Sequence, residues 1–181
     1  MSLSTKYYIL VQLLQGLRFV NQLGIVHLDV KELNVVVLRN IICKLIDFGE
    51  SYHFALSQQN HRPKYTIPYG APEVVTNTNG RSFTEKSDVF SLGILMHKVW
   101  FGKYPYFAFD HKKFQEMNFE NQLRSRTFFV PEENYNFGHP HIITILNQLI
   151  YKCIDQDEKK RPFLDWLTLI VKCSLNFITT L

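Results

Sequence analysis

Four polar side chains that could act together lie close in the sequence, between short apolar runs. Asp29, Lys31 and Asn34 fall within six residues, and Asp47 follows 13 residues after Asn34. Magnesium prefers hard oxygen ligands and is usually held by one or two carboxylates together with substrate phosphates. A lysine beside such a site can neutralise charge on a phosphoryl group during its transfer. These residue types at this spacing therefore predict a site for phosphate and metal.

The segments that carry these residues resemble the protein kinase family. Residues 27–34, HLDVKELN, are similar to the kinase catalytic loop, H-R-D-L-K-x-x-N. Residues 47–49, DFG, match the metal-binding triplet of the same family. Residues 71–73, APE, match a further family triplet. Because these elements occur in the family's order, the chain is identified as a kinase-like domain from about Ser2 to Phe177.

The resemblance implies a chemical role for each polar residue. Asp29 would be the catalytic base that orients a substrate hydroxyl, and Lys31 would steady the γ-phosphate of ATP. Asn34 and Asp47 would hold Mg²⁺, so ATP and Mg²⁺ are the expected cofactors and a protein is the expected substrate. Val36 would support the adenine ring from below. Plain core packing is an alternative role for Val36, and the two roles are compatible.

Thr66 indicates the class of kinase. It lies in residues 50–71, which resemble the family's activation and substrate-docking segment and are called the substrate segment below. It stands seven residues before Glu73, where serine/threonine kinases carry a threonine that bonds the catalytic aspartate and lysine. Lys31, two residues after Asp29, also fits the serine/threonine pattern. The alternative is that Thr66 is an ordinary loop hydroxyl.

Five further residues match structural positions of the family. His27 and Phe48 match packing residues, and His27 is not expected to act as a general base. Glu73 and Arg161 would form a buried ion pair. Asp88 would hold the catalytic-loop backbone from below through its carboxylate, although an aspartate in a first helical turn is also favoured by the helix dipole.

The hydrophobic pattern predicts a mainly α fold, and the resemblance implies a kinase-like C-terminal lobe in which small β elements flank the catalytic loop. Apolar residues recur at helical spacing over residues 4–23, 88–100, 142–154 and 163–177. Short β-branched runs occupy 25–26, 35–38 and 41–46. Helix caps are expected at Ser2 or Ser4 and at Ser87. The segments 50–71, 74–85 and 131–140 are polar and predicted as loops, and the aromatic-rich region 104–119 favours core packing over a docking surface.

The position of the catalytic loop predicts a partial kinase domain over residues 1–181. Asp29 lies only 28 residues after Met1, and no G-x-G-x-x-G motif occurs in the chain. The Gly-rich loop, the strand lysine and the helix glutamate of a complete kinase are therefore not expected here. Either a missing N-terminal lobe or another kinase is then an expected partner.

Composition narrows the class of protein further. The chain has 181 residues, of which 46% are hydrophobic, and a net charge of +4. Its basic residues are dispersed, so a nucleic-acid partner is not expected. No apolar run approaches the roughly 20 residues that span a bilayer, and no signal peptide opens the chain. The three cysteines, Cys43, Cys153 and Cys173, lack C-x-x-C spacing and are predicted to be buried thiols. A soluble, cytoplasmic protein is expected.

Two functions remain open from the sequence. In the first, the chain is part of a serine/threonine kinase that transfers phosphate from ATP to protein hydroxyls. In the second, it is a catalytically inactive, truncated kinase that acts as a decoy or interaction module. The presence of Asp29, Lys31, Asn34 and Asp47 favours the first, and the missing lobe favours the second for this chain by itself.

Overall fold

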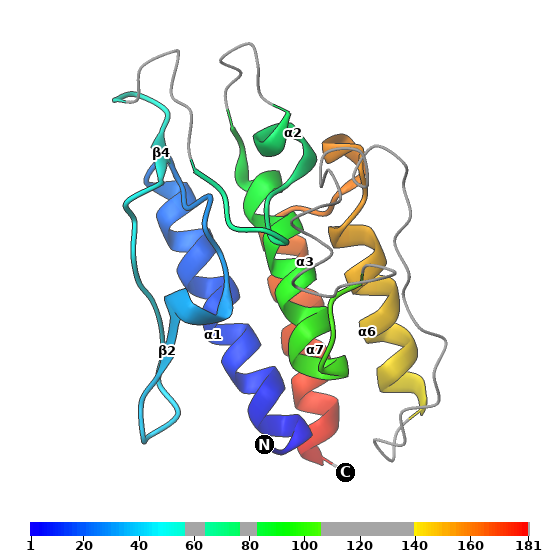
Figure 1. Ribbon diagram of the computed structural model, residues 1–181. Helices are drawn as coiled ribbons and strands as arrows, with labels where there is room; N and C mark the ends of the chain where they lie inside the picture. Colours follow the sequence, from blue (N-terminus) through cyan, green and yellow to red (C-terminus); the bar gives the residue numbers. More distant parts are fainter. Residues whose placement is uncertain (57–63, 77–82, 106–139, 181) are drawn as a thin grey trace.

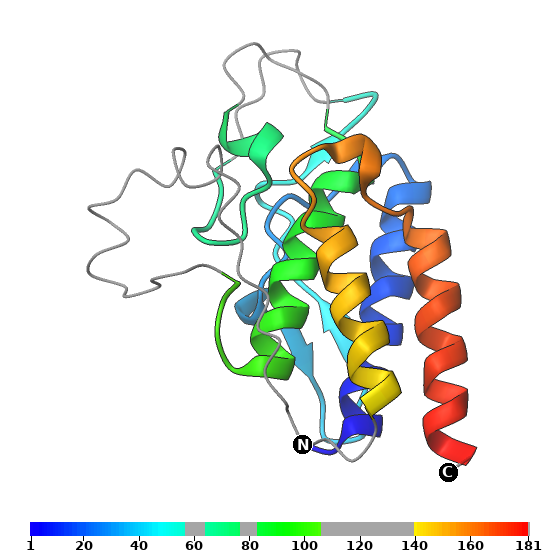
Figure 2. The ribbon, with the colours of Figure 1, turned by 90° about the vertical axis from the view of Figure 1, so that its right-hand side faces the viewer.

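Four long helices form a bundle in the part of the chain that the computed structural model describes, residues 1–56, 64–76, 83–105 and 140–180. Short strands and loops cover one side of this bundle (Figure 1, Figure 2). The helices are α1 (Leu3–Gln22), α3 (Glu85–Phe101), α6 (Pro140–Cys153) and α7 (Leu164–Thr180). Each helix boundary lies within three residues of the boundary predicted from the apolar spacing.

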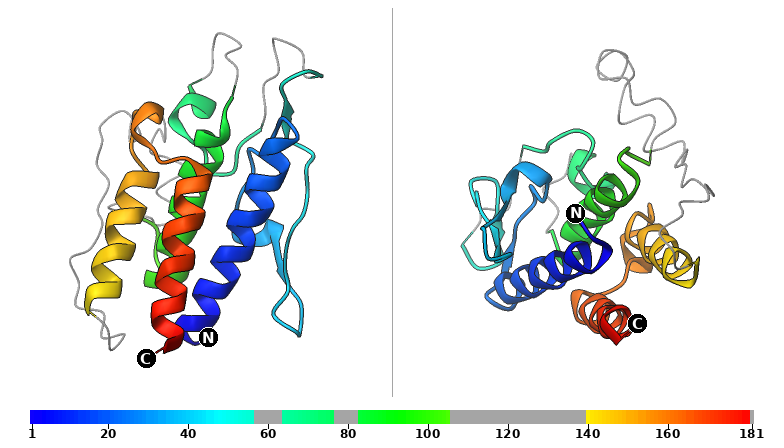
Figure 3. Two further views of the ribbon diagram at one scale, coloured as in Figure 1. Left: turned by 180° about the vertical axis from the view of Figure 1, so that it is seen from behind. Right: turned by 90° about the horizontal axis from the view of Figure 1, so that it is seen from below.

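Helix α1 is held by one apolar stripe and a side-chain cap. Leu10, Leu13, Leu14 and Leu17 recur at helical spacing, and all four are buried. Ser2 caps the helix by accepting a hydrogen bond from the Thr5 amide at 3.2 Å. The backbone leaves the helix at Gly24, whose φ of +80° favours glycine. Seen from behind, α1 lies beside α7 along most of its length (Figure 3).

Helix α3 lies at the centre of the bundle and begins earlier than the sequence predicts. The predicted cap, Ser87, is wrong, because the Thr84 side chain accepts the Lys86 amide hydrogen at 3.2 Å. The helix ends at Gly102, where φ is +71°. At Gly93 a Cβ atom would lie 2.7 Å from Cβ of Cys153, so only glycine permits α3 and α6 to approach this closely.

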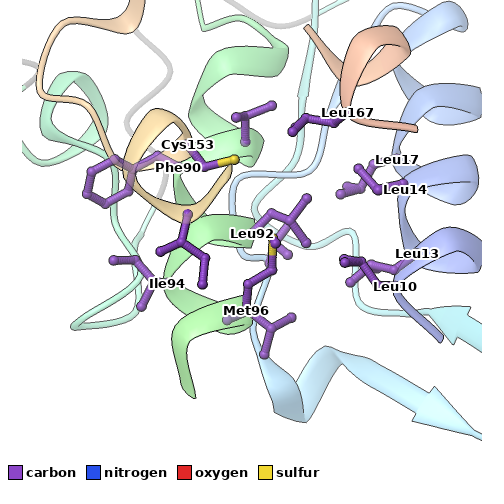
Figure 4. Close-up of a cluster of buried hydrophobic side chains, with 14 of the residues drawn as sticks. Leu10, Leu13, Leu14, Leu17, Phe90, Leu92, Ile94, Met96, Cys153 and Leu167 are labelled. Atoms are coloured by element: carbon purple, nitrogen blue, oxygen red, sulfur yellow. The ribbon is translucent and has the colours of Figure 1, made fainter. Parts of the chain in front are cut away.

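The core forms where the apolar faces of all four helices meet. Leucines of α1 face Leu92 and Met96 of α3, while Cys153 of α6 and Leu167 of α7 close the cluster from the other sides (Figure 4). The cysteine prediction holds only in part. Cys153 is buried and Cys43 half-buried, but Cys173 is exposed on α7 because it faces away from this core.

The short strands pair as two antiparallel ribbons. The strand β1 (Ile25–Val26) pairs with β4 (Tyr52–His53), and β2 (Val35–Val37) pairs with β3 (Cys43–Leu45). Strand β4 and helix α2 (Pro72–Val75) fall in segments predicted as loops, because elements this short carry no periodic signal. Two further single turns are the 3₁₀ helices η1 (Glu32–Asn34) and η2 (Glu158–Lys160).

Two sequence predictions cannot be compared with this fold. The aromatic-rich region from residue 106 to 119 and the loop 131–139 lie outside the described residues. Among the described helices, none is both long enough and apolar enough to span a bilayer.

Candidate functional site

The catalytic-loop residues are gathered between the two ribbons, on the side of α3 that faces the strands. The loop leaves β1, turns through η1 and enters β2, so Asp29, Lys31 and Asn34 are held at both ends by paired strands. Asp47 follows β3, the partner of β2. The antiparallel pairing of these two strands therefore brings Asp47 back towards the loop, as the motif spacing predicts.

Asp29 is the centre of a compact hydrogen-bond network. Thr66 donates its hydroxyl hydrogen to Oδ1 of Asp29 at 2.7 Å, and Lys31 forms an ion pair with Oδ2 at 2.7 Å. Lys31 Nζ also donates to the Thr66 hydroxyl at 2.8 Å. The side-chain amide of Asn34 donates to Oδ2 of Asp29 at 2.9 Å. Two residues of the loop, Lys31 and Asn34, and one of the substrate segment, Thr66, thus converge on a single carboxylate.

These contacts determine the ionisation of Asp29. Burial raises the pKa of its carboxyl group, but hydrogen bonds from Lys31 and Thr66, the charge of Lys31 and the Asn34 amide together lower the pKa below its ordinary value. Donors that bond the charged form of a carboxylate favour that form. Asp29 is therefore ionised at neutral pH and can accept a hydrogen bond from an incoming hydroxyl group.

Asn34 and Asp47 present oxygen atoms that suit a magnesium ion. The Asn34 amide nitrogen donates to the main-chain and side-chain oxygens of Asp29, both at 2.9 Å. This arrangement leaves Oδ1 of Asn34 as the atom for a cation. Asp47 is exposed, and its Oδ1 accepts the Gly49 amide hydrogen at 3.2 Å. One carboxylate and one amide oxygen fit Mg²⁺ when phosphate and water complete its coordination.

The described residues offer no alternative metal site made of protein ligands alone. In residues 1–56, 64–76, 83–105 and 140–180, no three His, Cys, Asp or Glu side chains converge on a position suited to a metal ion.

The backbone beside Asp29 is strained and is held from below. Leu28, immediately before Asp29, has φ of 64°, a left-handed conformation that is unfavourable for a branched side chain. Asp88 of α3 accepts the amide hydrogens of His27 and Leu28, both at 2.8 Å. Burial raises the pKa of Asp88 to about 7, and the two amide donors oppose this rise. The two bonds satisfy a fully buried carboxyl group, so Asp88 contributes to the shape of the loop.

His27 packs in the site as a neutral ring. Its Nδ1 accepts the Asp29 amide hydrogen at 3.3 Å, and its Nε2 lies 3.1 Å from the Ile46 carbonyl oxygen. Because a carbonyl oxygen can only accept, the proton is assigned to Nε2. Burial lowers the pKa of His27, with smaller opposing contributions from Ile46 and nearby carboxylates. The ring of Phe48 packs against it with a centroid separation of 4.7 Å, so both residues hold the loop.

Val36 faces away from the bundle. Its neighbours on β2, Val35 and Val37, line an apolar cavity of about 230 Å³ between α1, α3 and this strand. Side chains alternate between the two faces of a strand, so Val36 points to the opposite face, where it is 37% exposed. Core packing, the alternative role, does not explain why Val36 is 37% exposed among the described residues.

Glu73 and Arg161 form a buried ion pair that links α2 to the last loop. Arg161 donates from Nη1 and Nη2 to the two carboxylate oxygens of Glu73 at 2.7 and 2.8 Å. Its remaining donors reach the main-chain oxygens of Asp155 and Lys86, both at 2.8 Å. Ser87 adds a hydroxyl donor to Glu73 at 2.7 Å. The guanidinium group, fully buried, is thus bonded along both of its edges.

The structure also brings together residues that the sequence analysis did not assign to the site. Glu32 of η1 accepts hydrogen bonds from the phenols of Tyr69 and Tyr104. Neither of these contacts is predicted from the sequence. The two tyrosines lie 37 and 72 residues away from Glu32, and the three residues belong to no common motif. No short-range pattern in the sequence signals such a cluster.

Comparisons with known proteins place this geometry in a family. A model of the protein kinase domain matches residues 2–168. Similar curated proteins include an ephrin type-A receptor 3 from Danio rerio, 30% identical over 156 residues, and an ephrin type-B receptor 4 from Homo sapiens, 31% identical over 157 residues. A probable serine/threonine-protein kinase PLK from Dictyostelium discoideum is 32% identical over 149 residues.

In each of these relatives the match covers 81% of this chain but only 14% of the relative. The chain therefore corresponds to a small part of each relative. The family model nevertheless spans most of the chain, and it includes every residue of the site described above. This chain belongs to the protein kinase domain family.

Proposed function

We propose that the chain is the C-terminal lobe of a serine/threonine protein kinase, which transfers the γ-phosphate of ATP to a protein hydroxyl. The observation that carries this proposal is the network in which Thr66 and Lys31 both bond Asp29. An ionised aspartate with a lysine at its side is what phosphoryl transfer requires, because catalysis of this kind is mostly positioning and charge stabilisation.

Each site residue has a role that its contacts support. Asp29 would accept the hydrogen bond of the substrate hydroxyl on Oδ1, because Thr66 engages one lone pair of that oxygen and a second remains. Lys31 would place its charge beside the γ-phosphate. Asn34 and Asp47 would hold Mg²⁺, which supplies further neutralisation of phosphate charge when it is bound. Val36, exposed beside this group, would contact the adenine.

The serine/threonine assignment rests on Thr66. Its hydroxyl donates to Asp29 and accepts from Lys31, so both elements of the serine/threonine pattern take part in one contact. The Dictyostelium relative, by its name a probable serine/threonine-protein kinase, agrees with this assignment. The ephrin receptors are about equally similar to the chain, at 30% and 31% identity, so the relatives do not decide the class and the assignment depends on Thr66 and Lys31.

The proposed nucleotide site needs a second wall that the described residues do not supply. No Gly-rich phosphate loop occurs in its sequence, and Val36, Phe48 and Asp47 are all open to solvent on the same part of the site. We infer that an N-terminal lobe or another kinase covers these residues. The 181 residues alone are expected to bind ATP weakly and to turn over negligibly.

The test is a phosphorylation assay on the complete protein from its source cell. We expect Mg²⁺-dependent transfer from ATP to serine or threonine. Asp47→Ala should lower the rate by about a hundredfold or more, because a bound metal supplies several kcal/mol of charge stabilisation. Asp165→Ala, which removes an exposed carboxylate on α7, is the matched control and should leave the rate unchanged.

Two results would reject the proposal. One is a complete protein that shows no Mg²⁺-dependent transfer, and the other is full activity in Asp47→Ala. The first result would instead favour the second function, a decoy or interaction module that keeps the fold without the chemistry. The second result would show that Asp47 does not hold a metal that the transfer needs.

A further inference from the structure

A carboxylate and two phenols form a cluster at the edge of the catalytic loop. Glu32 accepts the Tyr69 hydroxyl hydrogen on Oε2 and the Tyr104 hydroxyl hydrogen on Oε1, the latter at 3.3 Å. The two phenol oxygens lie 3.2 Å apart, and their rings meet edge to face with centroids separated by 5.7 Å. Three segments of the chain therefore meet at Glu32: η1, the substrate segment and the turn after α3.

Hydrogen bonds hold the main-chain amide and the main-chain carbonyl of Tyr69 as well as its hydroxyl. Its amide donates to the Thr66 carbonyl oxygen at 2.7 Å. Its own carbonyl oxygen accepts the Ser91 hydroxyl hydrogen from α3 at 2.8 Å. Tyr69 thus connects Thr66, the residue that bonds Asp29, to both Glu32 and α3.

Together these contacts close a ring around the catalytic carboxylate. The ring runs from Asp29 to Thr66 through the hydroxyl, from Thr66 to Tyr69 through the backbone, and from Tyr69 to Glu32 through the phenol. Glu32 follows Lys31 in the chain, and Lys31 returns to Asp29. The substrate segment is therefore attached to the loop at two points, Thr66 and Tyr69. Two points fix its orientation, whereas a single bond would leave it free to pivot.

The pKa values of the two phenols favour the hydrogen bond of Tyr69 to Glu32, which is the second attachment of the substrate segment. Burial raises the pKa of the Tyr69 phenol above its ordinary value, and the bond to Glu32 raises it further. Burial also raises the pKa of Tyr104, and the carboxylate of Glu32 acts in the same direction. Both phenols therefore stay protonated as donors at neutral pH. Because both oxygens of Glu32 accept from these phenols, its charge is engaged within the protein.

We propose that Glu32 and Tyr69 are positioning residues that hold Thr66 against Asp29. The proposal rests on the proposed kinase function for its consequence on rate. Its structural content, the position of Thr66, does not depend on that function. Neither residue touches the reacting atoms, so their effect would pass entirely through Thr66 and Lys31.

The experiment compares the complete protein with three variants. Tyr69→Phe removes the donor and keeps the ring, Glu32→Ala removes the acceptor, and Glu32→Gln keeps a single carbonyl acceptor. Tyr8→Phe, which removes a phenol from the exposed face of α1, is the matched control. The readouts are hydrogen exchange at the amides of Tyr69 and Gly70, which both donate to Thr66, the pKa of Asp29 by carbon NMR, and kcat for phosphorylation.

We expect Tyr69→Phe and Glu32→Ala to exchange these amides about tenfold faster, which is the size expected for losing one bond to a charged acceptor. The Asp29 pKa should rise towards its ordinary value as the Thr66 bond loosens. The kcat should fall by a similar factor while KM for ATP is unchanged, and Glu32→Gln should lie between wild type and Glu32→Ala.

The outcomes separate this inference from the proposed function. If exchange and the Asp29 pKa in Tyr69→Phe equal those of Tyr8→Phe, the positioning role is wrong, whatever the activity. If hydrogen exchange and the Asp29 pKa change in Tyr69→Phe but kcat of an active enzyme does not, the positioning role is also wrong. If they change and the unaltered protein transfers no phosphate, the ring stands and the proposed kinase function fails.

Discussion

The ion pair between Glu73 and Arg161 and the one between Arg18 and Asp165 each join distant parts of the chain, yet their surroundings are opposite. The Arg161 and Glu73 side chains are 0% and 13% exposed, whereas those of Arg18 and Asp165 are 47% and 69% exposed. Around Arg161 every edge of the guanidinium group finds an acceptor. The Arg18 pair lies in water between α1 and α7.

This difference shows why ion pairs of one chemistry can have unequal importance. A buried charge loses its hydration, so it depends on its partner, and removal of one partner leaves an uncompensated charge. An exposed charge returns to water when its partner is lost, and many such pairs contribute little. The pair between Asp29 and Lys31 is intermediate, with side chains 9% and 17% exposed. We expect the effects of mutation to follow this order.

The largest effect is expected for Arg161→Ala. It leaves Glu73 with Ser87 as its remaining donor among the contacts described above, so the free energy of unfolding should fall by about 3–5 kcal/mol. Urea unfolding followed by circular dichroism would measure this loss. A double variant, Glu73→Leu with Arg161→Met, removes both charges and should recover much of the stability. An unaltered unfolding midpoint in Arg161→Ala would contradict the importance of burial.

A smaller effect, which depends on pH, is expected for Thr66→Val. This variant keeps the side-chain shape and removes one donor to Asp29, so the Asp29 pKa should rise towards its ordinary value. A carboxyl group with a lowered pKa stabilises the fold above its unfolded pKa, and this contribution is lost as pH falls through the folded pKa. The stability difference between wild type and Thr66→Val should therefore be present at pH 7 and shrink below about pH 4.

Carbon NMR titration of the Asp29 carboxyl group would measure this shift directly. Ser51, whose hydroxyl donates to the Phe48 carbonyl oxygen at 2.7 Å, offers a control, since Ser51→Ala removes a hydroxyl without touching Asp29. An Asp29 pKa that is the same in Thr66→Val and in wild type would remove Thr66 from the network.

The smallest effect is expected for Arg18→Ala. Because both partners are largely hydrated, the free energy of unfolding should change by less than about 1 kcal/mol. The same urea experiment gives the value, and raising the salt concentration should reduce it further through screening. A loss as large as that of Arg161→Ala would show that exposure does not separate the two pairs.

The sequence was sufficient for the parts of this molecule whose pattern is local. Apolar residues at helical spacing predicted α1, α3, α6 and α7, because one face or more of each helix is buried in the bundle. The residues of the site were also recognisable, since Asp29, Lys31 and Asn34 lie in one loop whose backbone holds them together. The contact between Thr66 and Asp29 was predicted only through the family resemblance.

The parts that the sequence left open depend on contacts between distant segments. Glu32, Tyr69 and Tyr104 are ordinary loop residues until the chain path brings them together. The cap of α3 was misplaced because Ser87 and Thr84 are both residue types that cap helices, and Ser87 instead bonds Glu73. Cys173 resembled a core residue because it falls in the stretch 163–177, where apolar residues recur at helical spacing, although it is exposed.

Helix α3 also has a consequence for how the chain folds. Fourteen of its 17 residues are buried, and α1, α6, β1 and η2 all pack on it. A helix that is buried on nearly every side depends on its neighbours, because the apolar side chains that they cover would otherwise meet water. The other helices in turn lose the surface on which they pack when α3 is absent. The bundle should therefore fold cooperatively, and a fragment that lacks either α3 or its neighbours should aggregate rather than retain part of the structure.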